Sequence, residues 1–514
     1  MMEGTKAVAG MNIKRLVFGI CVAFVLLGAF VDVSVASAKT IYVPDDYEKI
    51  QWAVDNASAG DTIVVRDGTY VENIDINKPH LTIKSENGSA NCVVQAANSN
   101  NHVFNVNADG VTIKGFTVTG ATGYWKAGIY LYKSNNWIEN VNASNSWYGI
   151  YLYHSSNNTI ANNNISSNNV DGIYLYYSSS NIIANNNVSS NNYHGIYLDD
   201  SCNNIIANNT ASNNCHDGIH LWDSNNNIIA NNTASNNDDG IDLTGSSNNI
   251  IANNTFHLNG MFVFNSYDNT VTNNTVNGKL LVYLENVNDY VVKDAGQVIA
   301  INSNNITIKD LNISYASVGV EFWKTSNSKI INNTASNNGH GIQLWESSNN
   351  IIANNIVSSN NYYGIHLYYS SSNIIANNIV SSNNDYGIYL WRSSNNIIYL
   401  NNFIDNTDNV YSYYSTNIWN STEPITYTYN GSQHTNYLGN YWGDYTGSDA
   451  DGDGIGDTPY SIDGDKDNYP LMERFENYIV TPVPNQPPIA NFTYSPEKPV
   501  VNQSVTFDAS SFGI

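Results

Sequence analysis

Basic charge is scarce in this chain of 514 residues. It has 20 Lys and Arg against 44 Asp and Glu, which gives a formal net charge of −24. Because proteins bind a phosphate backbone through Lys and Arg, this balance argues against nucleic acid as a partner. Charged residues are only 12% of the chain, whereas apolar residues are 42% and recur at regular intervals. That spacing indicates an ordered repeat rather than a disordered low-complexity chain.

Cysteine and long apolar runs are also rare. Three of the four Cys follow residue 38, an odd number and fewer than exported folds held by disulfides usually carry. The one long apolar run, LVFGICVAFVLLGAF, follows Lys14 and Arg15 and precedes Ala-Ser-Ala at 36–38. This order predicts a signal peptide cleaved after Ala38, and hence a secreted or cell-surface protein; an uncleaved anchor is the alternative. No later segment is apolar enough to span a membrane.

The repeat is marked by Gly followed by Ile or Val, at intervals of 21 to 23 residues on either side of a divergent stretch between Gly240 and Gly319. The markers are Gly128, Gly149, Gly172, Gly195, Gly218, Gly240, Gly319, Gly341, Gly364 and Gly387. A typical unit, GIYLYYSSSNIIANNNVSSNN, holds short alternating segments between Ser/Asn turns and leaves no room for a helix. Such a unit buries its apolar residues only by stacking on its neighbours. We therefore predict an all-β fold, a right-handed parallel β-helix with Ile and Leu ladders inside and stacked Asn amides at the turns.

The segments outside the repeat predict how the chain is divided. DDYEKIQWAVDNASAG reads as an N-terminal capping helix, with Asp45 and Asp46 offered as caps. The expected parts are a signal peptide (1–38), an N-terminal cap with the first coils (39–100), parallel β-helix repeats (101–405, with divergent coils at about 261–318), a C-terminal cap with an acidic segment (406–475), a Pro-rich linker (476–488) and a C-terminal piece (489–514).

Aromatic residues recur two and four places after the marker glycines, on the side opposite the Ile and Leu. On stacked coils they are expected to form a solvent-facing track suited to sugar rings. The alternative is that Tyr simply favours strands and pairs along the ladder. The candidate carbohydrate-binding residues are Tyr151, Tyr174, Tyr197, Trp222, Trp323, Trp345, Tyr368 and Trp391.

Acidic and His residues concentrate around the glycines of four consecutive coils. On adjacent coils carboxylates would lie about 5 Å apart, a spacing used in glycoside hydrolysis. Such proximity would raise at least one pKa and place an acid beside a base. The alternative is that these residues only form a polar surface, where divergence between the repeats has placed Asp in the turns. The candidate catalytic residues are Asp171, His194, His216, Asp217, Asp239 and Asp242.

A third constellation is DADGDGIGDTPY. Asp449, Asp451, Asp453 and Asp457, with the carbonyl of Ile455, match most of a calcium-binding loop, although Tyr460 stands where a bidentate Glu is expected. Hard oxygen ligands suit Ca²⁺, so we predict a structural calcium site. A disordered acidic linker is the alternative.

Three stretches carry a family resemblance: TIYVPDDYEKIQWAVDNASAGDTIVVRDGTYVENIDI, GKLLVYLENVNDYVVKDAGQVIAI and NYWGDYTGSDADGDGIGDTPYSIDGDKDNYPLM. Together they resemble archaeal cell-surface relatives of the NosD/CASH group, CASH denoting carbohydrate-binding proteins and sugar hydrolases. The resemblance covers roughly residues 40–475 and implies an exported, pectin-lyase-like β-helix. It implies no particular reaction, because this fold hosts lyases, hydrolases, epimerases and non-enzymes.

Two further implications of the resemblance concern copper and the C-terminus. The family name carries copper delivery, but copper prefers Cys, Met or grouped His, and five Met in the whole chain do not support a copper site. The stretch IANFTYSPEKPVVNQSVTFDASS resembles the opening strands of an Ig-like PKD domain. Its roughly 26 residues fall short of the about 100 that a sandwich needs, so this domain is truncated or the piece does not fold alone.

The sequence thus leaves three functions open. The first is an exported cell-surface protein that binds a polysaccharide or cell-envelope glycan, or that forms part of the envelope. The second is a polysaccharide lyase, hydrolase or uronate epimerase acting at the Asp/His cluster. The third is a purely structural surface spacer. A cleft beside Asp217 and Asp239 would favour an enzyme, and a flat wall would favour binding or scaffolding.

Overall fold

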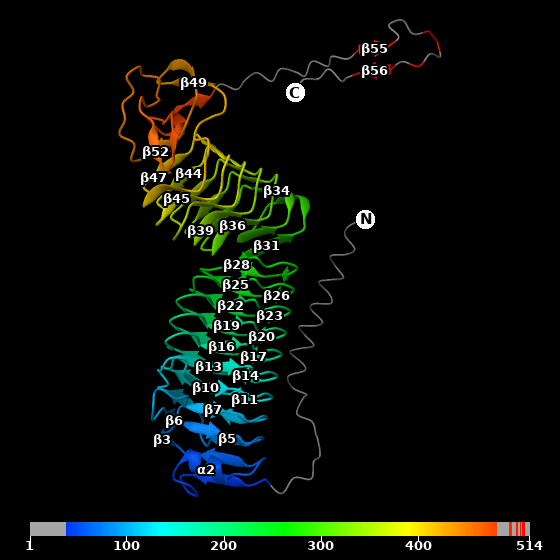
Figure 1. The fold of residues 1–514 in the computed structure, drawn as a ribbon, viewed down its shortest axis with the longest axis vertical. Coiled ribbons are helices and arrows are strands. Elements are labelled where there is room, and N and C mark those ends of the chain that lie inside the picture. The colour runs from blue at the N-terminus through cyan, green and yellow to red at the C-terminus, as the bar shows by residue number, and fades with distance from the viewer. Residues whose placement is uncertain (1–37, 481–492, 496–499, 502–503, 505, 509–514) are drawn as a thin grey trace.

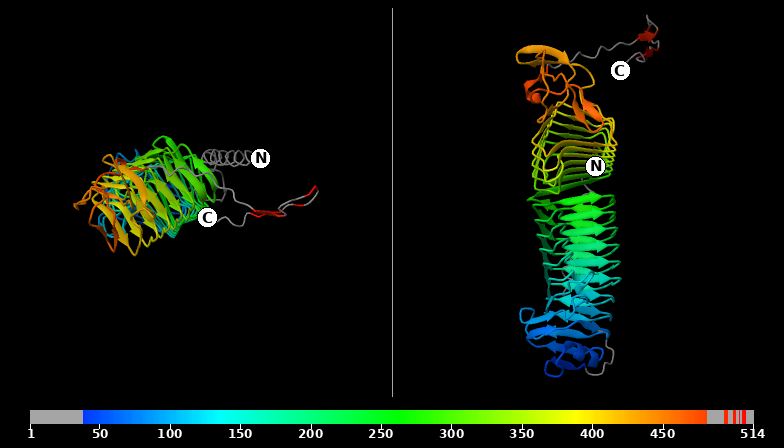
Figure 2. Two further views of the ribbon diagram at one scale, coloured as in Figure 1. Left: turned by 90° about the horizontal axis from the view of Figure 1, so that it is seen from above. Right: turned by 60° about the vertical axis from the view of Figure 1, so that its left-hand side comes forward.

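The computed structural model describes residues 38–480, 493–495, 500–501, 504 and 506–508. In these residues the chain forms a parallel β-solenoid in two segments, one tilted against the other (Figure 1, Figure 2). The predicted β-helix is confirmed, with one short α-helix and one 3-10 helix among the described elements. The predicted signal peptide lies almost wholly outside the described residues. None of the described helices is long and apolar enough to cross a bilayer.

The first segment runs from β1 (Thr40–Val43) to β30 (Thr275–Val276) and has three parallel sheets. One sheet follows the marker glycines and is called the lower glycine-led sheet. Its strands are β4 (Ile74–Ile76), β7 (Phe104–Val106), β10 (Ala127–Leu131), β13 (Tyr148–Tyr153), β16 (Ile173–Tyr176), β19 (Ile196–Asp199), β22 (Ile219–Trp222), β25 (Ile241–Thr244) and β28 (Met261–Phe264). The other two sheets extend from β1 to β29 (Thr270–Thr272) and from β3 (Gly68–Val71) to β30.

The second segment repeats this plan. Its upper glycine-led sheet consists of β31 (Lys279–Glu285), β33 (Gln297–Ile301), β36 (Val318–Trp323), β39 (His340–Trp345), β42 (Ile365–Tyr368), β45 (Tyr386–Trp391) and β48 (Asp408–Tyr413). Two further sheets run from β32 (Asn288–Val292) to β46 (Ile397–Tyr399) and from β35 (Asn312–Ser314) to β51 (Tyr441–Trp442).

Successive coils stack in axial register. Ile173 pairs with Ile196 and Leu175 with Leu198, and all four side chains are buried in the core. The marker glycines permit this stacking, because a Cβ on Gly195 would lie 2.6 Å from the carbonyl oxygen of the next marker. Any larger residue would push two coils apart at that point.

Asparagine ladders hold the turns. Asn186 donates from its backbone N–H and from its side-chain amide to Oδ1 of Asn209, at 2.9 and 3.0 Å, and Asn209 does the same to Asn232. The residue before each ladder position adopts the left-handed conformation, as Asn185 and Asn208 do at φ 57°. Asn tolerates that conformation better than most residues. Ladder and turn together explain the recurring Asn-Asn pairs and confirm the predicted amide stacking.

The bend between the segments comes from one hairpin. β30 pairs antiparallel with β31 across Asn277 and Gly278, whose φ values are 50° and 81°. Two residues with positive φ make the tight turn that an Asn-Gly pair favours. The chain direction reverses there, and the second segment is built on β31. The period break seen at about 261–318 is therefore the junction of the two segments.

A short helix, α2 (Ile50–Asn56), covers the first coil with Ile50, Ala53 and Val54 buried. The expected capping by Asp45 and Asp46 is wrong. Glu72 instead accepts hydrogen bonds from the N–H groups of Ile50 and Gln51, at 3.0 Å each. A carboxylate from the next coil reaches the free helix end, while Asp45 pairs with Arg66.

The far end is closed by a small irregular cap. A hairpin of β49 (Ile425–Tyr429) and β50 (Ser432–Asn436) is joined by β54 (Ile479–Val480), and β52 (Tyr460–Ile462) pairs with β53 (Asp465–Asp467). In the region of the predicted PKD-like piece the described residues include two strands that pair antiparallel, β55 (Thr493–Ser495) and β56 (Thr506–Asp508). The rest of that piece and residues 481–488 of the predicted linker lie outside the described residues.

Candidate functional site

A cleft of about 730 Å³ opens at the junction of the two segments. One wall comes from residues at the start of β19, β22 and β25 in the first segment. The other comes from the turns before β36 and β42 and the start of β39 in the second. The lining of the cleft includes Tyr193, His194, His216, Asp217, His220, Trp222, Asp238, Asp239, Asp242, His340 and Tyr362.

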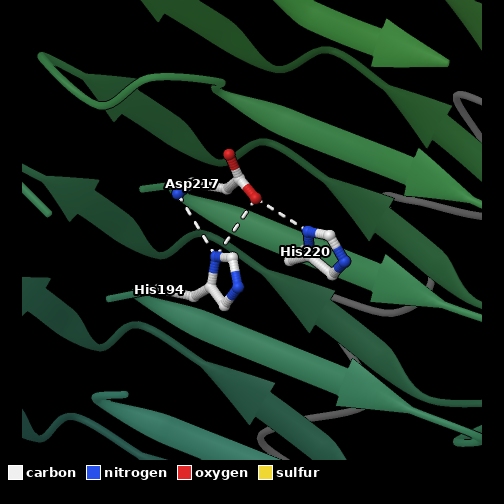
Figure 3. A group of neighbouring side chains, drawn as sticks. All are labelled: His194, Asp217 and His220. Carbon is white, nitrogen blue, oxygen red and sulfur yellow. Dashed lines mark hydrogen bonds and ion pairs between the residues drawn. The ribbon is translucent and has the colours of Figure 1, made fainter. Parts of the chain in front are cut away.

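Two imidazoles converge on one carboxylate in the inner wall of this cleft (Figure 3). Oδ2 of Asp217 lies 2.7 Å from Nδ1 of His220 and 3.1 Å from Nδ1 of His194. The two rings stack with centroids 4.5 Å apart, and all three side chains are buried. The axial register explains the arrangement, because Tyr197 on β19 pairs with His220 on β22 and so sets His194 one coil below Asp217.

Further carboxylates gather beside this group. Asp217, Asp239 and Asp242 each offer an oxygen within 4.8 Å of the others. Oδ2 of Asp242 also lies 3.4 Å from Nδ1 of His220. Glu321, on β36 of the second segment, is completely buried, and neither of its carboxylate oxygens has a hydrogen-bond partner among the described residues.

Burial and hydrogen bonding shift the pKa values of these groups in different directions. Burial would raise the pKa of Asp217, but the two imidazoles beside its carboxylate, those of His194 and His220, outweigh it and lower that pKa. Burial also opposes the charge on His220, yet the hydrogen bond with Asp217 and the nearby Asp242 raise its pKa. Burial lowers the pKa of His194 to about 4 and raises that of Asp242 to about 7.

The two remaining acids hold their protons more firmly. Burial, together with the charge on Asp217, raises the pKa of Asp239 well above its ordinary value. Burial, together with the charge on Asp239, does the same for Glu321. The site thus combines an ionised carboxylate with neighbouring protonated ones, a combination suited to acid and base chemistry.

Of the six predicted catalytic residues, five line the cleft. The exception is Asp171, which is buried one coil below His194 and accepts a hydrogen bond from its N–H at 3.0 Å. Burial raises the pKa of Asp171 to about 7. Within the cleft, His216 is exposed and packs its ring 4.1 Å from that of Tyr193, outside the buried group.

The aromatic residues do not form one continuous exposed track. Tyr197 and Trp222 line the cleft, and Trp222 is 47% exposed. Trp345, Tyr368 and Trp391 are half-buried and form a second aromatic run, with the first two rings 4.5 Å apart.

Three of the predicted track residues are buried, so the expectation that they face solvent is wrong. Tyr151 and Tyr174 are only 5% and 4% exposed, because neighbouring rings stack over one another at 5.0 Å. Trp323 is 3% exposed and packs against Phe264 of the first segment, with centroids 5.0 Å apart. These side chains stabilise the outer sheet and the junction rather than offering a surface for sugar.

The second wall of the cleft and the acid behind it were missed from the sequence. Glu321 stands two places after its marker glycine, as Asp242 does, so the same register could have singled it out. His340 and Tyr362 stand one and two places before their marker glycines, as Asp239 and Asp238 do, so the register singles out their columns too, although only the bend brings their turns opposite Asp239.

The acidic segment of the cap brings three carboxylates together. Asp449, Asp451 and Asp453 each present a carboxylate oxygen within 4.8 Å of the others. The N–H groups of Gly452 and Gly454 both donate to Asp449, at 2.8 Å. Asp457 and Ile455, the other predicted ligands, are not part of this group of three.

Asp457 accepts hydrogen bonds from Ser448 and from the N–H of Ala450, at 3.1 and 3.0 Å, which closes the base of the loop. Ile455 is buried and forms a β-bridge with Leu471. The calcium site at this loop remains a prediction.

Comparison with known families matches two models. Residues 83–233 and 183–294 match the right handed beta helix region, and residues 285–447 match the family described as Periplasmic copper-binding protein (NosD). The fold is accordingly a right-handed parallel β-helix, with each model covering less than half of the chain.

Among curated proteins, a cell surface glycoprotein of Methanothermus fervidus is 32% identical over 165 residues. The match covers 25% of this chain, and the chain spans only 26% of the length of that relative. Among solved structures, pectate lyase Pel9A is 17% identical with a TM-score of 0.34, over 47% of this chain and 79% of that one. The catalytic domain of a GH87 alpha-1,3-glucanase is 15% identical with a TM-score of 0.38, over 76% and 69%. These likenesses concern the fold alone.

The copper implied by the NosD description can be tested against the residues of the matched segment. Residues 285–447 contain no Cys or Met, and their imidazoles are His340, His366 and His434. The rings of His340 and His366 lie 6.0 Å apart, and none of the three clusters of potential metal ligands in the described part of the chain falls within this segment. Its donor set therefore does not fit a copper site.

Proposed function

Because the chain is a right-handed β-helix with a carboxylate-lined cleft, we propose that it is an exported cell-surface protein that binds a polysaccharide in this cleft and hydrolyses it. One observation carries the proposal. Asp217, Asp239 and Asp242 bring carboxylate oxygens within 4.8 Å of one another in the wall of an accessible cleft. A concave site with convergent polar groups is the usual form of a small-molecule or substrate site.

The lining of the cleft favours sugar as the ligand. Trp222, Tyr193 and Tyr362 are exposed around the acids, and aromatic faces stack on the apolar faces of sugar rings. No Lys or Arg is found among the residues that line the cleft. A polyanionic chain would therefore meet only like charge, which favours a neutral glycan over a polyuronate.

The carboxylates favour hydrolysis over elimination. Hydrolysis of a glycosidic bond needs one carboxyl group to protonate the leaving oxygen and a second to assist attack at the anomeric carbon. The carboxyl groups of Asp239 and Asp242 lie close enough to act on the same glycosidic bond. The lyases and epimerases left open by the sequence act on uronates, and no Lys or Arg among the described lining residues would neutralise the carboxylate of such a substrate.

Surface location is supported by two independent observations. The first residues of the sequence carry the pattern of a signal peptide. The relative from Methanothermus fervidus is described as a cell surface glycoprotein, over the quarter of its length that matches.

The experiment is a screen of neutral polysaccharides for release of reducing ends, repeated on Asp239→Asn and Asp242→Asn. We expect each variant to lose at least about 100-fold in rate, the scale on which acid or base catalysis contributes. Asp223→Asn is the matched control, because Asp223 is exposed on the same solenoid segment but does not line the cleft. Equal rates for Asp239→Asn, Asp242→Asn and the control would refute hydrolysis at this site.

Glycan binding without cleavage is the second candidate, favoured by the second aromatic run of Trp345, Tyr368 and Trp391, which lies outside the cleft. Trp222→Ala should weaken binding of the retained polysaccharide about tenfold, because one exposed stacking contact is lost. Trp391→Ala measures whether the outer run takes part. Binding that neither change affects would exclude these rings as the contact, and the absence of both binding and turnover would leave the structural spacer as the better account.

A further inference from the structure

The three buried side chains His194, Asp217 and His220 form more than a hydrogen-bonded pair. We propose that they hold a divalent transition-metal ion of the Zn²⁺ kind in the inner wall of the cleft. The proposal does not rest on the proposed hydrolysis, because metal binding is measured without any glycan.

The spacing of the ligand atoms supports a shared ion. Nδ1 of His194 and Nδ1 of His220 lie 3.1 and 2.7 Å from the same oxygen of Asp217. Ligands bound at about 2.0–2.2 Å from one metal ion lie roughly 3 to 3.5 Å from each other. The separation of 3.1 Å falls in this range, and the separation of 2.7 Å is shorter, so a small outward movement of His220 would give the spacing that an ion imposes.

The hydrogen-bond pattern at His194 leaves a gap that a cation fills. The backbone N–H of Asp217 points at Nδ1 of His194 at 3.3 Å, which marks this ring nitrogen as unprotonated. The same nitrogen faces Oδ2 of Asp217 at 3.1 Å. Two electron-rich atoms at that distance repel each other unless a cation lies between them (Figure 3).

The charge around the group points the same way. Asp238, Asp239 and Asp242 share the cleft lining with Asp217, and Glu321 is buried beside them, yet no Lys or Arg lines the cleft. Buried carboxylates are ordinarily paired or bound to a metal ion. The two imidazoles are the only basic side chains of the described residues within ion-pair distance of Asp217 and Asp242.

The ligand set selects the class of ion. Two imidazole nitrogens and one carboxylate oxygen suit Zn²⁺, Cu²⁺, Ni²⁺ or Fe²⁺, whereas Ca²⁺ and Mg²⁺ take oxygen ligands. Three protein ligands with a fourth position open to solvent are the pattern of catalytic rather than structural zinc sites. Here the open side is the cleft. The site differs in chemistry and place from the oxygen-only loop at residues 449–453 and from the segment that matches the NosD description.

The test uses the whole mature chain, stripped of metal by a chelator and kept in excess Ca²⁺ so that the oxygen-only loop is saturated. Co²⁺ is added as a spectroscopic probe, and Zn²⁺ then competes for it. We expect one Co²⁺ per chain, with visible absorption bands typical of nitrogen ligation, and displacement by one equivalent of Zn²⁺.

Variants then assign the ligands. His194→Gln and His220→Gln should each weaken binding at least tenfold, whereas His216→Gln should leave it unchanged, since His216 is exposed in the same cleft but outside the group. Melting temperatures show which variants are folded. If the unaltered chain binds no Co²⁺ or Zn²⁺, or if folded His194→Gln and His220→Gln bind as well as His216→Gln, the proposal is overturned and the group is a hydrogen-bonded relay. The first outcome needs no variant, so a folding defect cannot rescue the proposal.

Discussion

Trp323, in the second solenoid segment, donates a hydrogen bond from its indole Nε1 to the hydroxyl oxygen of Tyr267 in the first, at 2.6 Å. This bond joins two parts of the chain that a bend separates. It joins the end of β36 to the turn after β28, whereas the turns that wall the cleft precede β36 and β42, so it ties the two segments together outside the cleft.

The junction should therefore be sensitive to Trp323. Trp323→Ala removes a buried ring packed against Phe264 and leaves the Tyr267 hydroxyl with Lys324 as its remaining partner. We expect a loss of about 3–5 kcal/mol in the free energy of unfolding of this region, followed by thermal unfolding and by proteolysis at residues 265–296. The control is Trp222→Ala, which removes an exposed indole and should cost less than about 1 kcal/mol. Similar losses for both variants would contradict a specific role of the junction.

The Asn ladder predicts a cost for removing one rung. Asn209 accepts two hydrogen bonds from Asn186 and donates to Asn232 and to the carbonyl of Ile183. Asn209→Ala removes these hydrogen bonds and leaves the buried backbone N–H of Asn186 without its acceptor, and we expect a loss of about 2–4 kcal/mol by urea unfolding. Asn192→Ala, at an exposed turn position, should change stability by about 0.5 kcal/mol or less. A ladder that merely tolerates Asn would show no difference between the two.

Calcium should stabilise the C-terminal cap. If Asp449, Asp451 and Asp453 bind Ca²⁺, saturating Ca²⁺ adds free energy to the folded state only, by about 3 kcal/mol at 100 times the dissociation constant. The melting temperature of the cap should rise by several degrees over that measured with chelator. Asp451→Asn should abolish most of this rise, while Asp405→Asn, an exposed change outside the loop, should preserve it. Identical melting temperatures with calcium and with chelator would refute the calcium site.

Asp467 predicts a pH dependence of stability. Its carboxylate is fully buried, and burial raises its pKa from 3.8 to about 6 despite hydrogen bonds from Asn440, Tyr469 and Trp442. Between these two values the folded state keeps a proton that the unfolded chain has released. Stability from this group is therefore greatest below pH 3.8 and is lost as the pH rises through about 6.

Asp467→Asn isolates the effect, because Asn does not titrate. The difference in unfolding free energy between the variant and the unaltered chain should shift by about 3 kcal/mol in favour of the variant from pH 4 to pH 7. Asp405→Asn serves again as the exposed control. A pH-independent difference for Asp467→Asn would mean that the folded state does not hold this proton.

The solenoid itself followed from the sequence because its information is local and repeated. Each coil carries its own Gly, its own Ile-x-Leu strand and its own Asn-Asn turns, so one unit predicts the next. The same register also brought His194, Asp217, Asp239 and Asp242 to one face, since a column position is a matter of counting residues.

The spacing of residues in the sequence could not predict which side chains are buried or which residues form the second wall of the cleft. Whether an outward Tyr is exposed depends on the rings stacked above and below it, and Tyr174 is covered where Trp222 is not. Glu321, His340 and Tyr362 reach the site through the bend at Asn277 and Gly278, a single hairpin that redirects every later coil. The sequence by itself determined the coil, its core and the acidic column. Only the tertiary structure turned that column into a cleft, because the second wall comes from coils much later in the chain, which the hairpin redirects and which contacts such as that of Trp323 with Phe264 hold against the first segment.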